Sequence, residues 1–252
     1  MIIEVGVAGA LGRMGSLIAQ TVAEAPDLQL VAAFDRYGGE VAGTEVQTDA
    51  GCLAGAEVVV DFTHPEVVMA NLSRYREMNC HAVVGTSGFT TERIASVRRI
   101  WPPAGASNCL IVPNFSIGAV LMMRFAKEAA RYFRASEVIE LHHDNKADAP
   151  SGTAVSTAVG MAEEGGQHRS IESEEILPGA RGGMVEGVPV HSVRLPGLLA
   201  HQEVLLGNPG EILTIRHDST DRISFLPGVM LALRGVASLP PGVSVGLEAL
   251  LN

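Results

Sequence analysis

The first 35 residues combine an apolar stretch, a glycine turn and a helical pattern, and this combination constrains the fold more than any other part of the chain. Residues 2–8 are mostly apolar, glycines follow at positions 9, 12 and 15, and residues 17–22 have helical spacing. Strand, glycine turn and helix in this order are typical of a dinucleotide-binding unit, because glycine allows a tight turn, close approach to a pyrophosphate and close helix packing. The spacing departs from the usual Gly-x-Gly-x-x-Gly. The residues expected to contact the cofactor in this turn are Gly9, Ala10, Leu11, Gly12, Arg13 and Met14.

The next apolar stretch, residues 28–34, ends at an acid. Asp35 lies about 20 residues after Gly15, where an acid can accept hydrogen bonds from ribose hydroxyls. Arg36 follows directly, and it and Arg13 are cations that could attract a 2′-phosphate. The sequence therefore predicts that NADH and NADPH are both accepted. The alternative is that the two arginines are ordinary surface charges.

Further apolar and helical segments alternate along the first half of the chain. Strands are expected at residues 57–62, 81–84 and 109–112, and helices at residues 65–78 and 91–100. This alternation predicts an α/β fold with a Rossmann-like, doubly wound parallel sheet. Ligands bind at the carboxyl ends of such strands. The residues expected to contact the cofactor there are Thr63, Gly85, Thr86, Ser87, Pro113, Asn114 and Phe115.

Residues 137–154 concentrate two histidines, a lysine, several acids and a Ser-Gly-Thr turn, and we place the active site in this segment. Residues 136–141 are expected to form a strand, and Ser151 is expected to be the N-cap of a helix. Neighbouring strand residues point to opposite faces, so His142 and His143 cannot both bind one metal ion, and we expect no metal site.

Two parts of this segment suit anionic groups. Lys146 can hold a carboxylate or deliver a proton, and His142 can exchange protons near neutral pH. The backbone N–H groups of Gly152 and Thr153, at a helix N-terminus, offer a second anion site. Two anion sites indicate a dicarboxylate substrate.

The other acids of the segment are given supporting roles. Asp148 is expected to support the loop, by pairing with Lys146 or by a hydrogen bond to the backbone. Glu137 and Glu140 are interpreted as structural. The competing interpretation of the whole segment is a structural histidine in a strand and a solvated surface lysine.

These motifs resemble the 4-hydroxy-tetrahydrodipicolinate reductase (dihydrodipicolinate reductase) family, especially its actinobacterial members, over nearly the whole chain. The most specific motif is residues 137–154, which fits E-x-x-E-x-H-x-x-x-K-x-D-x-P-S-G-T-A. The other stretches that carry the resemblance are residues 9–15, 61–66, 84–89, 113–118, 177–183, 193–197 and 200–203.

The resemblance implies an NAD(P)H-dependent oxidoreductase of diaminopimelate and lysine biosynthesis. It would reduce a cyclic imine dicarboxylate with loss of a hydroxyl as water, giving tetrahydrodipicolinate. The family's pattern implies proton transfer by His142, and proton donation and substrate binding by Lys146. A homotetramer is also implied. The resemblance and the helix start together give the further residues expected to bind substrate. They are His143, Ser151, Gly152, Thr153 and Arg222.

Length and a change of pattern after Pro113 predict two domains. We expect a dinucleotide-binding domain at residues 1–113 and 222–252. The remainder, residues 114–221, is expected to be an α+β domain with an open mixed sheet that binds substrate and forms oligomer contacts. Its expected elements are a helix at residues 117–133, a glycine-rich acidic stretch at residues 165–187 and strands at residues 188–194, 201–206 and 212–217; a helix at residues 224–233 follows it.

Charge and cysteine content limit the classes of partner and the cellular compartment that we expect. The net charge of −10 argues against nucleic acid. No segment reaches the apolar length of a membrane span, and we expect a cytoplasmic protein with three reduced, buried cysteines. Two rival functions stay open. A non-catalytic dinucleotide sensor would not need His142 and Lys146, whereas a dehydrogenase of another imino or keto diacid would share the same chemistry.

Overall fold

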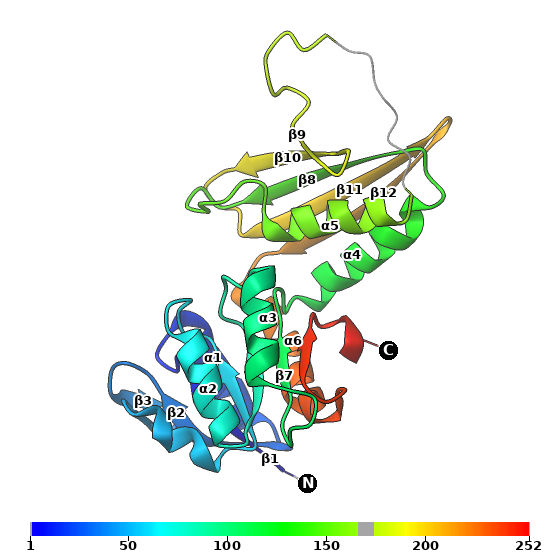
Figure 1. Cartoon of the computed structure of the whole chain (residues 1–252). Coiled ribbons are helices and arrows are strands. Elements are labelled where there is room, and N and C mark those ends of the chain that lie inside the picture. Colours follow the sequence, from blue (N-terminus) through cyan, green and yellow to red (C-terminus); the bar gives the residue numbers. More distant parts are fainter. Residues whose placement is uncertain (1, 166–173, 252) are drawn as a thin grey trace. The chain divides into compact units, whose positions relative to one another are not determined.

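The computed structural model describes residues 2–165 and 174–251. The chain divides into two compact units, one formed by Met1–Phe115 and Phe225–Asn252 and the other by Ser116–Ser224, and Figure 1 shows the elements of each. These boundaries lie two to three residues from those expected from the sequence. Gly166 and His168, in the glycine-rich stretch, lie outside the described residues.

The first unit is built on one eight-stranded sheet with the order β13-β7-β6-β5-β1-β2-β4-β3. Every neighbouring pair is parallel except β3 with β4, which form an antiparallel hairpin at one edge. The expected doubly wound sheet is therefore confirmed, with an added edge hairpin. Its strands are β1 (Ile3–Ala8), β2 (Leu28–Phe34), β3 (Gly39–Val41), β4 (Thr44–Gln47), β5 (Val58–Asp61), β6 (His81–Val84), β7 (Cys109–Ile111) and β13 (Val243–Val245).

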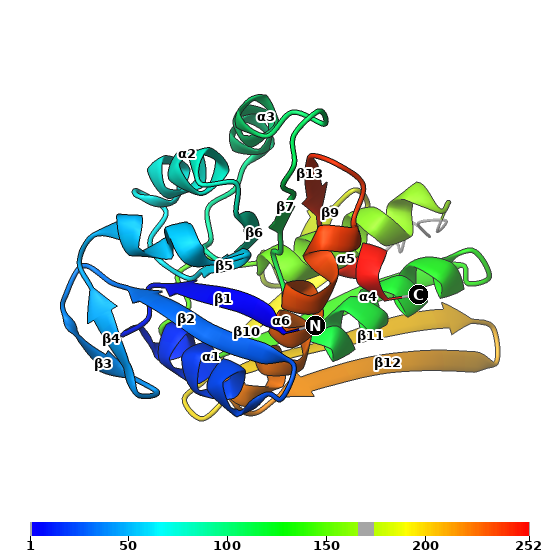
Figure 2. The same cartoon turned by 90° about the horizontal axis from the view of Figure 1, so that it is seen from below.

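Helices cover both faces of this sheet. Figure 2 shows α1 (Arg13–Glu24) on one side of β1 and β2, and α2 (Val68–Glu77) and α3 (Thr91–Ile100) on the other. Helix α1 buries Gly15, Ile18, Ala19 and Val22, which share one face at the i, i+3, i+4, i+7 spacing of an amphipathic helix. The remaining helical segments of this unit are α6 (Leu226–Gly235) and the 3-10 turns η1 (Ala50–Gly55), η3 (Val236–Ser238) and η4 (Glu248–Leu250).

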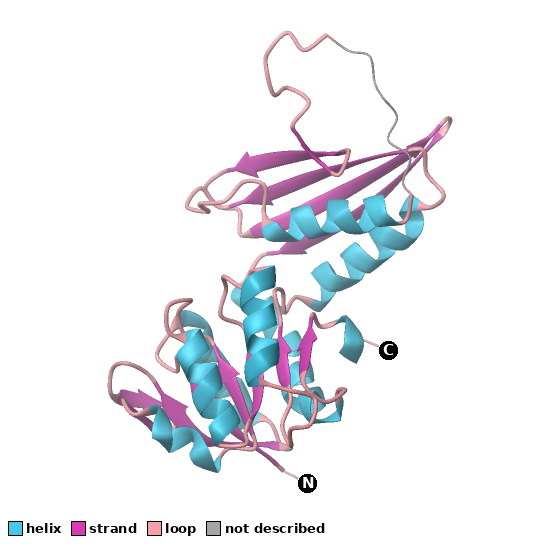
Figure 3. Cartoon of the chain, viewed as in Figure 1, coloured by secondary structure: helices cyan, strands magenta, loops and turns pink. Residues whose placement is uncertain are grey.

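The second unit is a five-stranded sheet with two helices on one face, α4 (Ile117–Ala130) and α5 (Gly152–Glu163), as Figure 3 shows. The strand order is β12-β11-β8-β10-β9, with β8 and β10 parallel and the other pairs antiparallel, so the expected mixed sheet is confirmed. Small residues of both helices pack on apolar strand residues such as Val138 and Val204. The strands are β8 (Ala135–His142), β9 (Gly183–Val185), β10 (Val188–Arg194), β11 (Ala200–Asn208) and β12 (Glu211–Ser219), followed by the 3-10 turn η2 (Arg222–Phe225).

Some details differ from the sequence-based expectation. Helix α2 begins at Val68 and not at residue 65, because the His64 carbonyl accepts from the N–H groups of Val67 and Val68 in a preceding turn. Cys80 and Cys109 are buried as expected, but Cys52 is only half-buried. None of the described helices is both long enough and apolar enough to cross a membrane.

Candidate active site

The glycine turn after β1 has the backbone that the sequence requires. Gly9 has φ +80°, a conformation that favours glycine, and a Cβ at Gly15 would overlap the Gly9 carbonyl oxygen. Helix α1 can therefore start directly against the turn, with Gly12 as its N-cap. Leu11, Gly12 and Arg13 are exposed. The turn leaves backbone close to the surface, as binding of a pyrophosphate demands.

Asp35 lies at the carboxyl end of β2, beside this turn. Its Oδ2 accepts from the Leu11 backbone N–H at 3.1 Å, and its Oδ1 accepts from the Tyr37 N–H at 3.3 Å. The Arg36 guanidinium lies 4.7 Å from the centre of the Tyr37 ring. The structure thus brings Asp35 to the glycine turn, while Arg36 and Arg13 remain exposed. An ionised carboxylate can accept several hydrogen bonds, so these contacts leave capacity for a ribose hydroxyl.

A buried carboxylate joins the next two strand ends, and it is not among the residues expected to contact the cofactor. Asp61, the last residue of β5, is fully buried, and its Oδ1 accepts from the hydroxyls of Thr63 at 2.6 Å and Thr86 at 2.7 Å. Its Oδ2 accepts from Asn71 at 3.1 Å and from the Tyr75 hydroxyl at 2.8 Å. Thr63 and Thr86 are expected to contact the cofactor, so Asp61 fixes two parts of that rim.

The other expected rim residues follow β6 and β7. Gly85 is packed beneath the Phe62 ring, which would overlap a Cβ at this position. The Phe62 and Phe115 rings lie 5.3 Å apart, so the segments after β5 and β7 meet. Ser87 and Pro113 are exposed, Asn114 is half-buried and Phe115 is buried. The structure therefore places these residues at the carboxyl ends of adjacent parallel strands.

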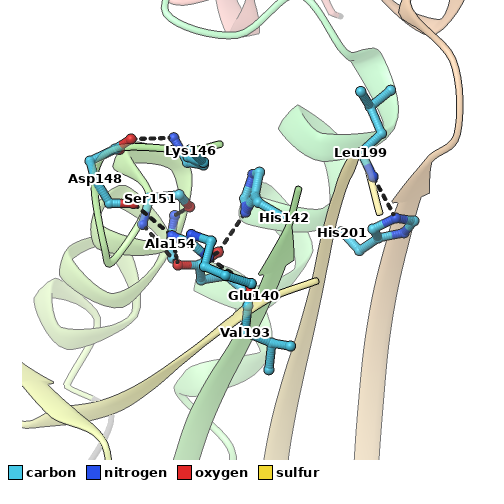
Figure 4. Close-up of polar contacts among 10 residues, drawn as sticks. Glu140, His142, Lys146, Asp148, Ser151, Ala154, Val193, Leu199 and His201 are labelled. Carbon is cyan, nitrogen blue, oxygen red and sulfur yellow. Dashed lines mark hydrogen bonds and ion pairs between the residues drawn. The ribbon is translucent and has the colours of Figure 1, made fainter. Parts of the chain in front are cut away.

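In the second unit, the end of β8 holds a buried acid against the expected catalytic histidine. Glu140 and His142 lie two residues apart and so share one face of the strand. The Nδ1 atom of His142 lies 2.5 Å from Oε2 of Glu140, whose side chain is completely buried. Figure 4 shows His142 directed toward Glu140. The sequence-based interpretation of Glu140 as structural did not include this contact with His142.

Arg194, at the end of the neighbouring strand β10, completes the cluster. Its Nη1 and Nη2 atoms donate to Oε2 and Oε1 of Glu140 at 2.9 and 2.8 Å, a bidentate ion pair. Nη2 also donates to the backbone carbonyl of Asp148 at 2.6 Å. The Asp148 carboxylate in turn accepts from Lys146 at 2.6 Å, which confirms the expected supporting pair and is visible in Figure 4.

The helix start after this loop is built as expected. Ser151 is the N-cap of α5, and its hydroxyl accepts from the Ala154 N–H at 3.2 Å. Its own N–H donates to Oε1 of Glu140 at 3.2 Å. A Cβ added at Gly152 would meet no atom within 4 Å, so the helix N-terminus has open space beside it. That space and the positive end of the helix suit a carboxylate.

The structure does not bring every expected residue into this cluster. His143 lies just beyond β8, half-buried, and its carbonyl accepts from the Lys146 N–H. Arg222 opens the turn η2, and no described residue forms an ion pair with it. Arg194 was not selected from the sequence. Its signal was weak, because only the pairing of β8 with β10 places it opposite His142.

The charges of the cluster follow from its contacts. Burial alone would raise the pKa of Glu140, but the hydrogen bonds from His142 and Arg194 outweigh burial and lower this pKa to about 2. The bond from Lys146 lowers the pKa of Asp148. Both acids are therefore carboxylates at neutral pH. Within residues 2–165 and 174–251, no group of three side chains has the composition and spacing to hold a metal ion.

Comparison with known families covers both units. A family model described as "Dihydrodipicolinate reductase, N-terminus" matches residues 3–115, and one described as "Dihydrodipicolinate reductase, C-terminus" matches residues 118–251. The chain is 54% identical to the 4-hydroxy-tetrahydrodipicolinate reductase of Nocardia farcinica, with all of both chains covered. It is also 54% identical to the enzyme of the same name from Thermobifida fusca, with 99% of both chains covered.

A solved structure agrees with these matches. The dipicolinate-bound dihydrodipicolinate reductase from Paenisporosarcina sp. TG-14 is 36% identical, with a TM-score of 0.85 over 98% of this chain and 99% of that one. The scyllo-inositol dehydrogenase from Lactobacillus casei, with a TM-score of 0.63 and 12% identity, shares the fold alone. Together, the matches to both units show that the chain belongs to the dihydrodipicolinate reductase family of oxidoreductases.

Proposed function

We propose that this protein reduces 4-hydroxy-tetrahydrodipicolinate to tetrahydrodipicolinate with NADH or NADPH and releases the hydroxyl as water, as a step of diaminopimelate and lysine biosynthesis. The observation that carries the proposal is the cluster of His142, Lys146 and the start of α5 in a chain of this family. A proton carrier, a cation and a helix N-terminus are the groups that a dicarboxylate imine requires.

Each group has a distinct task in this proposal. The backbone N–H groups of Gly152 and Thr153 bind one substrate carboxylate, and the Ser151 cap fixes their direction. Lys146 binds an anionic part of the substrate and donates a proton. His142 transfers a proton through Nε2, because its Nδ1 faces Glu140. His143 and Arg222 are proposed as further substrate contacts.

The cofactor would supply a hydride to the imine carbon. The first unit fits a dinucleotide, since glycine is required at positions 9 and 15 and Asp35 is held beside the turn. Residues of the turn would hold the pyrophosphate, and the Asp61-supported rim would hold the nicotinamide end. Asp35 suits a ribose hydroxyl, and Arg13 and Arg36 suit a 2′-phosphate, which supports use of both NADH and NADPH.

The test is direct. Purified protein is mixed with freshly generated 4-hydroxy-tetrahydrodipicolinate, and the loss of NADH and of NADPH absorbance is followed separately. Oxidation of either cofactor is the expected result, and the two rates rank the cofactors. If both cofactors bind and neither is oxidised, the substrate assignment fails and a panel of other imino and keto diacids becomes the next experiment.

We also propose a homotetramer in the cytoplasm. Helices α4 and α5 cover one face of the second sheet, while half-buried and exposed residues such as Glu203 and Arg216 lie on its other face, which supports contact with further copies. Light scattering at micromolar concentration checks the assembly. The three unpaired cysteines suit a reducing compartment, and cell fractionation tests the location.

A further inference from the structure

We propose that Glu140 and Arg194 are positioning residues that fix the tautomer of His142 and hold it in register with the Lys146 loop and the start of α5. This inference rests on the proposed function, because it explains how the substrate groups of that function are aligned. Neither residue needs to touch substrate. Their action would be exerted through the hydrogen bonds that they make.

The two oxygens of Glu140 receive hydrogen bonds from three parts of the chain. Oε2 accepts from Arg194 Nη1 at 2.9 Å and faces His142 Nδ1 at 2.5 Å. Oε1 accepts from Arg194 Nη2 at 2.8 Å and from the Ser151 N–H at 3.2 Å. One buried carboxylate therefore links the end of β8, the end of β10 and the N-cap of α5.

The contact with Glu140 determines where the histidine carries its proton. An ionised carboxylate can only accept, so Nδ1 of His142 must be the donor. In the neutral imidazole, Nε2 is then an acceptor and is the only ring nitrogen left for substrate. Without the carboxylate, the ring could exchange its two nitrogens in these roles.

Arg194 extends the same control to the lysine. Its Nη2 donates to the Asp148 carbonyl at 2.6 Å, and the Asp148 carboxylate accepts from Lys146 at 2.6 Å. The guanidinium fork donates to both oxygens of Glu140 and to the loop at once, and the single nitrogen of an ammonium group does not reproduce this bidentate geometry. The histidine and the lysine are thereby linked through one planar guanidinium group.

Stability alone does not account for this arrangement. Buried ion pairs are weak contributors to stability because desolvation offsets much of their attraction. In addition, Arg194 Nε is buried and has no hydrogen-bond partner among the described residues, which is itself unfavourable. The geometry is better explained by orientation of His142 and the loop.

The same strand contains a matched control. Glu137 also pairs with a histidine and an arginine, through His191 at 2.8 Å and Arg181 at 2.6 Å. It lies three residues before Glu140 and so on the opposite face of β8. Glu137→Gln removes an equivalent carboxylate without touching the His142 cluster.

The first readout is independent of turnover. Nitrogen-15 NMR of the imidazole rings, with His142→Gln to assign the signals, should show wild-type His142 protonated at Nδ1. In Glu140→Gln, the amide presents only one acceptor, so a population protonated at Nε2 should appear, whereas E137Q should leave the His142 signals unchanged. An Nε2–H tautomer in the wild type, or an unchanged tautomer in E140Q, would overturn the proposal.

The second readout is kinetic. E140Q should lower kcat by roughly 10- to 100-fold, as loss of an orienting partner commonly does, with a smaller change in KM. E137Q should keep wild-type kcat. Arg194→Lys retains Glu140 and the Nδ1–H tautomer but loses the bridge to Asp148, so it should raise KM for the substrate. Wild-type kcat in a folded E140Q would contradict the inference.

The two proposals can fail separately. If the wild type does not oxidise cofactor with this substrate, the proposed function fails, and the NMR tautomers still decide the role of Glu140. If E140Q does not fold, the wild-type tautomer and R194K carry the test. An R194K protein with unchanged kcat and KM would show that the arginine positions nothing.

Discussion

Lys146 carries the cation of the loop after β8, and its ammonium group lies 2.6 Å from the Asp148 carboxylate. Lys146→Ala should lower kcat/KM by roughly 100-fold or more, because it removes both a charge and a proton donor. Steady-state kinetics with saturating NADH measures this loss. Lys127→Ala is the control, since Lys127 pairs with Glu163 on the helices. Near-normal kcat/KM in K146A would remove the lysine from the reaction.

Asp35 is the residue that should set cofactor preference. Asp35→Ala removes an anion that would repel a 2′-phosphate and leaves Arg36 in place, so the ratio of kcat/KM for NADPH to that for NADH should rise. Asp27, at the other end of β2, pairs with Arg234 and provides the control variant Asp27→Ala. An unchanged ratio in D35A would exclude Asp35 from the adenosine pocket.

At the residue scale, the sequence predicts the role of a side chain when that role depends on residues adjacent in the chain. Ser151 could be identified as an N-cap because the Pro-Ser-Gly-Thr pattern is local, and the structure confirms it. Glu140 is interpreted from the sequence as structural, and its contact with His142 could have been expected because both residues lie on one face of β8 with Val138. Arg194 lies 54 residues from Glu140, so no local pattern could pair them.

The hydrogen bonds of Asp61 join β5, α2 and the segment after β6. Loss of these bonds should destabilise all three parts. Burial and the nearby Asp61 charge raise the pKa of Tyr75, so its hydroxyl remains a donor. Asp61→Asn leaves buried donors without an acceptor and should lower the free energy of unfolding by about 2–3 kcal/mol. It should also weaken cofactor binding, measured by titration of NADH fluorescence.

A milder substitution in the same group of residues shows how much one hydrogen bond to Asp61 contributes. Tyr75→Phe removes one of the donors and should cost about 1 kcal/mol, with smaller loss of cofactor affinity. Urea denaturation of both variants gives the comparison. If D61N is as stable as the wild type, the carboxylate does not hold the strand ends together.

At the element scale, a continuous apolar run or a clear helical pattern decided what could be predicted. The bounds of β6, α3 and β10 match the expected ranges, since each is a well-bounded apolar or amphipathic segment. Four short strands were not expected: β3, β4, β9 and β13. Each of these four strands has at most two apolar residues, whereas the equally short β6 has three in a row. In addition, β13 is defined only by its pairing with β7.

At the scale of the whole molecule, the free energy of unfolding should fall at low pH. Glu140 has its pKa lowered to about 2 from the usual 4.5, so the stabilisation that depends on its ionised form is present above pH 4.5 and is lost as the pH falls toward 2. Burial lowers the pKa of His81 and His217, so the unfolded chain takes up these protons first and stability already declines below about pH 6.5.

Urea denaturation between pH 8 and pH 3 measures this dependence. The free energy of unfolding should be flat at the upper end and fall steadily on acidification. E140Q should flatten the part of the curve below pH 4.5, and a curve identical to the wild type would mean that this carboxylate does not contribute to acid sensitivity.

The first unit is interrupted in sequence, and this affects the order in which the chain can fold during synthesis. Ser116–Ser224 is contiguous, whereas the first unit receives α6 and β13 only from the last residues. Until they emerge, β7 is an unprotected edge strand. The second unit should therefore become protease-resistant first in ribosome-stalled chains. The N-terminal residues, although made earliest, should acquire protection last.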